Sequence, residues 1–152
     1  MEEVNESKEI SNVVETVRID DKDWFLQMLV GMANDGVGVS LTLNVGGLLV
    51  TGNLVSGKEY FIEFGKVFAK AIDPEDGENA KGIRESYEMM AQDVYGQDES
   101  KSSPPTYLHM KNAKYYSVSG DSLPNNDETS LWRGRISEVG GFSLGSFSKT
   151  KG

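Results

Sequence analysis

The stretch from Gly38 to Tyr60, GVSLTLNVGGLLVTGNLVSGKEY, constrains the fold more than any other part of the chain. Apolar and polar residues alternate over residues 39–45, which is the period of a strand with one buried face. Gly46-Gly47 supplies the positive-φ positions of a two-residue turn into a second strand, residues 48–55. Gly52 within that strand is typical of a bulge that bends a small sheet. We predict a β-hairpin that leads directly into a helix.

Three segments have the apolar spacing of amphipathic helices. The first covers residues 21–34 and begins among aspartates, which can cap its free amides. The second follows Ser56-Gly57-Lys58-Glu59, the spacing of a capping box, and ends before Asp73-Pro74. The third covers residues 80–95. We expect the apolar stripe of the first helix to be core, and this stripe consists of Trp24, Phe25, Met28, Leu29, Met32 and Ala33.

Strand patterns return after the polar loop at residues 96–105. Residues 106–110 and 113–118 resemble two strands with Lys111-Asn112 at their junction, and residues 131–139 alternate again. Gly140-Gly141 predicts a second hairpin turn into a short last strand over residues 142–147. We therefore predict an α+β fold with a small, strongly bent antiparallel sheet, an N-terminal helix and a two-helix insertion.

The length and the charge distribution of the chain limit its possible domain organisation and partners. The 152 residues suit a single domain, which we place at residues 20–147, between a mobile acidic tail at 1–19 and a short tail at 148–152. Residues 1–100 contain 20 Asp and Glu against 8 Lys and Arg, a net charge of −12, whereas residues 101–152 contain 4 against 7, a net charge of +3. Bulk charge therefore disfavours nucleic-acid binding, while the last third can carry a local basic face.

The chain lacks the residues that most catalytic and metal sites need. It contains one histidine, His109, and no cysteine, so thiolate sites are excluded and nucleophilic catalysis would depend on His109 alone. Gly141-Phe142-Ser143-Leu144-Gly145 has the letters of a nucleophile elbow, but no helix follows it. We expect a protein without cofactor or metal that is not an enzyme. The absence of export signals and of a long apolar run favours an intracellular protein.

The most suggestive binding pattern is Trp132-Arg133-Gly134-Arg135. Alternation places Arg133 and Arg135 on one strand face beside Trp132, within the basic part of the chain. Arginines next to aromatic rings can hold anionic or peptide partners. The alternative is a pair of solvated arginines opposite a core tryptophan. We predict Trp132, Arg133 and Arg135 as partner-binding residues.

Two families resemble this chain. The hairpin with a central glycine, the stretch TYLHMKNAKYY and Arg133-Gly134 resemble a split Sm-like barrel, in which an Arg-Gly dipeptide helps to hold RNA between subunits. The helices between Ser56 and Tyr95 interrupt that pattern, and residues 108–112 contain no clean equivalent of the Asp and Asn expected in the RNA loop. The resemblance implies an oligomeric RNA-binding protein as the alternative function.

The more specific resemblance is to the gas-vesicle accessory protein U family. It is carried by SLTLNVGGLLVTGNLVSGKEYF, YLHMKNAKYY and LWRGRISEVGGFSLG, in this order and spacing, within residues 20–147. The resemblance implies a cytoplasmic, non-enzymatic protein that assists vesicle assembly or the association of vesicles with one another. It also implies that the partners are other copies of the chain and gas-vesicle surface or assembly proteins, with no membrane contact.

Overall fold

The computed structural model describes residues 21–96, 103–117, 119–123 and 129–146. The predicted tails at residues 1–19 and 148–152 lie outside the described residues. In chain order the elements are α2 (Trp24–Asn34), β1 (Ser40–Val45), β2 (Leu48–Val55), α3 (Gly57–Ile72), α4 (Glu78–Tyr95), β3 (Tyr107–Tyr116), β4 (Ser122–Leu123), β5 (Ser130–Arg135), the 3₁₀ helix η2 (Ile136–Glu138) and β6 (Gly141–Leu144).

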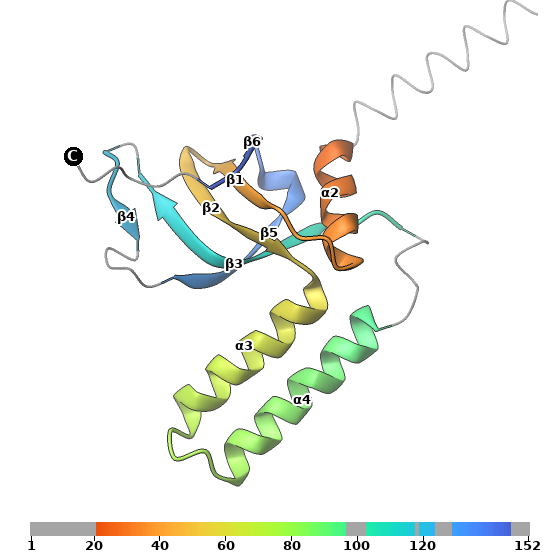
Figure 1. The fold of residues 1–152 in the computed structure, drawn as a ribbon, viewed down its shortest axis with the longest axis vertical. Coiled ribbons are helices and arrows are strands. Elements are labelled where there is room, and N and C mark those ends of the chain that lie inside the picture. The colour runs from red at the N-terminus through yellow and green to blue at the C-terminus, as the bar shows by residue number, and fades with distance from the viewer. Residues whose placement is uncertain (1–20, 97–102, 118, 124–128, 147–152) are drawn as a thin grey trace, which may run out of the picture.

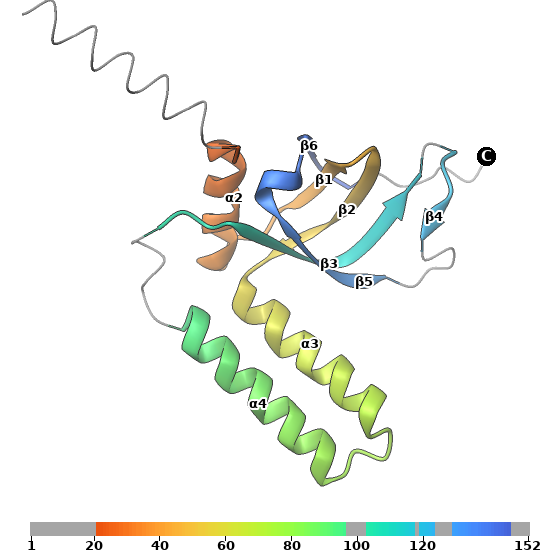
Figure 2. The same ribbon diagram turned by 180° about the vertical axis from the view of Figure 1, so that it is seen from behind.

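The strands form one antiparallel sheet in the order β4-β3-β2-β1-β6, with β5 also paired to β3. Among the described strands β5 and β6 do not pair, so the sheet is bent but not closed. Figure 1 shows α2 packed beside the sheet, whereas α3 and α4 form a hairpin that projects away from it, and Figure 2 shows the same arrangement from behind. The prediction of an α+β fold with an N-terminal helix and a two-helix insertion is confirmed.

The β1–β2 hairpin has the predicted register and turn. Leu43 pairs with Val50 and Val45 with Leu48; the turn residues Gly46 and Gly47 have φ of 60° and 86°, which side chains rarely tolerate. The predicted bulge lies at Gly52, where the pairing of β2 with β3 changes register. A Cβ at Gly52 would lie 3.0 Å from the carbonyl oxygen of Lys111, so glycine lets the two strands approach.

Two strand predictions are wrong. Residues 107–116 form one strand instead of two, because a bulge at Asn112, with φ of 53°, absorbs the irregularity. The second Gly-Gly hairpin is also absent. Instead η2 follows β5 directly, and β6 crosses to the far side of β1, where Phe142 pairs with Leu43. Gly140-Gly141 therefore leads into an edge strand.

The core lies between α2 and the sheet. Asp23 caps α2 by accepting a hydrogen bond from the Phe25 amide at 2.8 Å. The expected core stripe of this helix is wrong for Trp24 and Met28, which are 74% and 47% exposed. Of the same stripe, Ala33 is buried in the core and Leu29 packs against it. The buried side of α2 carries Leu26, Val30 and Ala33. The whole core consists of Leu26, Val30, Ala33, Leu41, Leu43, Val50, Leu54, Leu108, Met110, Ala113 and Ile136.

In the α3–α4 hairpin, two glycines of α3 face aromatic side chains of α4. A Cβ at Gly65 would lie 2.5 Å from the Cβ of Tyr87, and a Cβ at Gly57 would collide with the ring of Tyr95. Both glycines therefore let an aromatic side chain of α4 lie directly on the α3 backbone. The closeness explains why α3 and α4 pack on each other along their length, while only the first turn of α3 contacts the sheet.

Candidate functional site

Arg133 and Arg135 lie on β5 directly opposite two ring-bearing residues of β3. In the β3–β5 register Arg133 pairs with His109, and Arg135 pairs with Tyr107. Because side chains of alternate strand residues share a face, these four residues form one patch, which we call the arginine face. Its position is next to the first turn of α3, where Tyr60 and Phe61 contact His109.

The Arg133 side chain is held by Tyr107 and His109 of β3. Its guanidinium carbon lies 3.7 Å from the centroid of the Tyr107 ring, which is a cation–π geometry. Its Nε atom donates a hydrogen bond to His109 Nε2 over 3.2 Å. The charged end of this long side chain is thereby held at the surface in one orientation.

His109 is buried, with 2% of its surface exposed. The rings of Tyr60, Phe61 and Tyr95 lie 4.7, 5.9 and 6.0 Å from the imidazole, centroid to centroid. Burial lowers the pKa of His109 to about 4, and the charge of Arg133 acts in the same direction. The imidazole is therefore neutral near pH 7, and since Nε2 accepts a hydrogen bond, its proton is on Nδ1.

Arg135 completes the arginine face at its outer edge. Its Nε atom donates to the hydroxyl oxygen of Tyr107 over 3.4 Å. This hydrogen bond and the charge of the guanidinium lower the pKa of Tyr107. Neither arginine forms an ion pair with a carboxylate of the described residues. The arginine face thus presents two positive charges, already positioned by Tyr107 and His109, that a partner anion can neutralise.

Trp132 lies on the opposite face of β5. It pairs with Met110 of β3 and packs, partly buried, against the hydrophobic core. A Cβ at Gly134 would lie 2.2 Å from its ring, so the indole covers the strand backbone there. The structure therefore places Arg133 and Arg135 together and separates Trp132 from them. Partner binding by the three residues stays a prediction.

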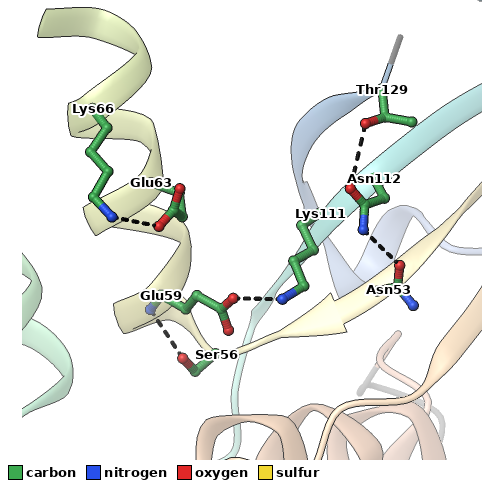
Figure 3. A network of polar contacts seen from close by, with 8 residues as sticks. All are labelled: Asn53, Ser56, Glu59, Glu63, Lys66, Lys111, Asn112 and Thr129. Carbon is green, nitrogen blue, oxygen red and sulfur yellow. Dashed lines mark hydrogen bonds and ion pairs between the residues drawn. The ribbon is translucent and has the colours of Figure 1, made fainter. Parts of the chain in front are cut away.

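Figure 3 shows a polar network that joins the α3–α4 hairpin to the sheet. Ser56 caps α3 by accepting a hydrogen bond from the Glu59 amide at 3.0 Å, as the capping box predicts. The Glu59 carboxylate, however, accepts from Lys111 Nζ of β3 at 2.8 Å. The reciprocal half of the capping box is replaced by a link between α3 and β3, which raises the pKa of Lys111.

A second surface that the sequence reasoning treated only as helix periodicity lies on the α3–α4 hairpin. The Tyr87 ring contacts the rings of Phe64 and Phe68 at 5.5 and 6.1 Å. Met90 and Val94 follow Tyr87 at three- and seven-residue spacing, so they continue the same side of α4. Exposed fractions are 41% for Phe68, 41% for Met90 and 57% for Val94. We call these five residues the hairpin face.

The sequence of this chain matches the family described as gas vesicle protein GvpU-like over residues 23–147. The chain belongs to the GvpU-like family. The match extends from the cap of α2 through β6, so both the arginine face and the hairpin face lie within the part that the GvpU-like family shares. Searches of the curated proteins and of the solved structures find no match.

Membership in the GvpU-like family confirms the resemblance to the gas-vesicle accessory protein U family and supports a gas-vesicle role for this chain. Within the described residues, no helix is both long and apolar enough to cross a membrane. No three His, Asp or Glu side chains of the same residues gather as ligands for a metal ion. The resemblance to an Sm-like barrel stays a prediction.

Proposed function

We propose that this chain is a non-enzymatic accessory protein of gas vesicles, which assists vesicle assembly or the association of vesicles through protein–protein contacts and self-association. Family membership supports the gas-vesicle part of the proposal. The observation that carries the contact part is the hairpin face, a group of apolar side chains on two helices that project from the sheet, of which Phe68, Met90 and Val94 are exposed.

Exposed apolar side chains of this size normally mark a surface that another protein covers. The hairpin face has the helical spacing by which a partner helix is recognised. Burial of its side chains in a partner would supply the driving force for association, since full burial of one large apolar side chain contributes about 1.5–3 kcal/mol. The occupants that we propose are other copies of the chain and gas-vesicle surface or assembly proteins.

The arginine face provides a second contact of different chemistry. Arg133 and Arg135 are exposed and have no described carboxylate partner, so we propose them as polar partner-binding residues, with Trp132 behind them. The proposed protein needs no cofactor and acts in the cytoplasm, where gas vesicles form. Its role is to hold protein surfaces together.

The test is co-flotation of the purified protein with isolated gas vesicles. We expect binding by the wild-type chain and a loss of more than half of it for Phe68→Gln or Met90→Gln. Met89→Gln is the matched control, because Met89 is 67% exposed but, two residues after Tyr87, lies on the side of α4 turned away from Tyr87 and the hairpin face. Equal binding by all three variants, or none by the wild type, would contradict the proposal.

The same preparation tests the alternative function. An Sm-like RNA-binding protein would bind a single-stranded oligonucleotide at low salt, release it at high salt and lose it in Arg133→Ala. We expect no such binding from a chain of net charge −9. Salt-dependent RNA binding without vesicle co-flotation would favour the alternative.

A further inference from the structure

The arginine face is complementary to an acidic segment in another part of the described chain. This segment, which we call the acidic turn, covers residues 73–78, from the end of α3 to the first residue of α4, and has the sequence DPEDGE. Asp73 accepts hydrogen bonds from the amides of Gly77 and Ala80, at 3.0 and 3.3 Å. Asp76 forms an ion pair with Arg84. These two carboxylates shape the turn.

The other two carboxylates of the acidic turn have no such role. Glu75 and Glu78 are exposed, and neither makes a hydrogen bond or an ion pair with a described residue. They are presented on a turn whose backbone Asp73 and Asp76 hold in place. The acidic turn therefore presents two carboxylates without an ion pair, and the arginine face presents two guanidinium groups without an ion pair among the described residues.

One molecule cannot bring these groups together. The arginine face lies against the first turn of α3, because Tyr60 and Phe61 contact His109. The acidic turn follows the last residue of the same helix, whose 16 residues span about 24 Å. Figures 1 and 2 show the hairpin projecting from the sheet as a straight arm, with the turn at its far end. The complementary charges can meet only between copies.

We propose that the arginine face is a carboxylate-binding site for the acidic turn of a second copy of this chain. Arg135 and Arg133 would pair with Glu75 and Glu78 of that copy. The contact joins two different surfaces, so it closes into a dimer where two copies exchange it and extends to further copies where it is one-sided. This inference rests on the self-association proposed above. It specifies the polar contact through which two copies would bind each other.

Exposed ion pairs are individually weak and are screened by salt. The contact should therefore form where many copies are concentrated, for instance on one vesicle surface, and add to the apolar contact of the hairpin face through multivalency. The screening length falls from about 10 Å at 0.1 M salt to about 3 Å at 1 M. We expect the contact to disappear over this range.

The test is a paramagnetic label on one copy and nuclear magnetic resonance of another. The chain contains no cysteine, so Asn79→Cys provides a single nitroxide site beside the acidic turn. We expect this label to broaden the amide signals of Tyr107, Arg133 and Arg135 in an isotope-labelled copy at low salt, and the signals to recover at 1 M salt. A label at Ser143→Cys on β6 is the matched control and should leave them sharp.

A charge exchange makes the test specific. Glu75→Lys with Glu78→Lys in the spin-labelled copy should abolish the broadening, and Arg135→Glu in the isotope-labelled copy should restore it. Arg135 is chosen because it makes one hydrogen bond at the surface, whereas Arg133 also holds His109. Sharp arginine-face signals with the wild-type turn, or broadening that survives the charge reversal, would overturn the inference.

The two proposals fail separately. A chain that co-floats with vesicles but shows no broadening contradicts this inference and leaves the proposed function intact. A chain that shows the broadening but does not co-float with vesicles contradicts the proposed function and leaves the contact between copies intact.

Discussion

Arg133 donates from Nε to Nε2 of His109 over 3.2 Å, so a buried neutral imidazole orients an exposed guanidinium. The two residues face each other across β5 and β3. A protonated imidazole could not accept this hydrogen bond and would repel the arginine. The orientation of the Arg133 charge on the arginine face therefore depends on a histidine that stays unprotonated.

The first prediction concerns pH. Below pH 6.5 an ordinary histidine of the unfolded chain binds a proton, whereas folded His109 does so only near its pKa of about 4. Acid therefore favours the unfolded chain, and His109 lowers the free energy of unfolding progressively between pH 6.5 and 4. Because one pKa unit corresponds to about 1.4 kcal/mol, the full window amounts to about 3 kcal/mol. Urea unfolding across this range measures the loss.

His109→Gln is the control, since its side-chain oxygen can still accept from Arg133 but does not titrate. The carboxylates contribute equally to both proteins. The wild type should lose its stability advantage over the variant between pH 6.5 and 4, and parallel curves for the two proteins would count against the assignment.

The second prediction concerns the helix contact at Gly65. Gly65→Ala places a methyl group 2.5 Å from the Cβ of Tyr87, so the helices must separate, and we expect a loss of about 1–3 kcal/mol. Gly82→Ala lies within α4 with open space around it and should instead add about 0.5–1 kcal/mol through helix propensity. Denaturant midpoints with unchanged slopes measure both effects. A stabilising Gly65→Ala would show that α3 and α4 are not closely packed.

The local elements were predictable because their signals are local. Gly46-Gly47 between two alternating stretches indicates a hairpin wherever it occurs, and Ser56 before an apolar repeat indicates the start of a helix. The pairing of β6 with β1 could not be predicted, because it joins residues about a hundred positions apart. Nothing in the sequence of residues 141–144 indicates which strand they pair with. A second Gly-Gly pair suggested a hairpin that the intervening η2 helix prevents.

The candidate site was also predictable only in part. Alternation along β5 places Arg133 and Arg135 on one face, and the structure confirms this placement. Only the register of β3 against β5 brings His109 and Tyr107 opposite them, and register between distant strands has no short sequence signature. The residues of the hairpin face could not be assigned from the sequence for another reason, because helix periodicity is the same for a stripe that faces a core and a stripe that faces solvent.

The third prediction separates the two roles of the polar network in Figure 3. Ser56→Ala removes the α3 cap and should cost about 1 kcal/mol at any salt concentration. Glu59→Gln leaves the cap intact but removes the charge that holds Lys111, so it should cost about 0.2–1 kcal/mol at low salt and less at 1 M. Thermal unfolding at two salt concentrations distinguishes them. A strong salt dependence for Ser56→Ala would contradict the separation.

The fourth prediction concerns the two apolar stripes of α2. Trp24, Met28 and Met32 share one side at four-residue spacing, and Leu26, Val30 and Ala33 share another; periodicity alone does not say which is buried. Leu26 is fully buried and Trp24 is 74% exposed. Leu26→Ala should therefore cost about 2–5 kcal/mol through loss of contacts and a cavity, whereas Trp24→Ala should change the free energy of unfolding by less than about 0.5 kcal/mol.

Fluorescence gives an independent measurement, because quenching by iodide in the folded protein should affect Trp24 strongly and Trp132 weakly. Trp24→Ala should then remove most of the quenchable emission. A large loss of stability in Trp24→Ala would mean that another surface covers this stripe in solution, and the unfolding midpoint would then rise with protein concentration.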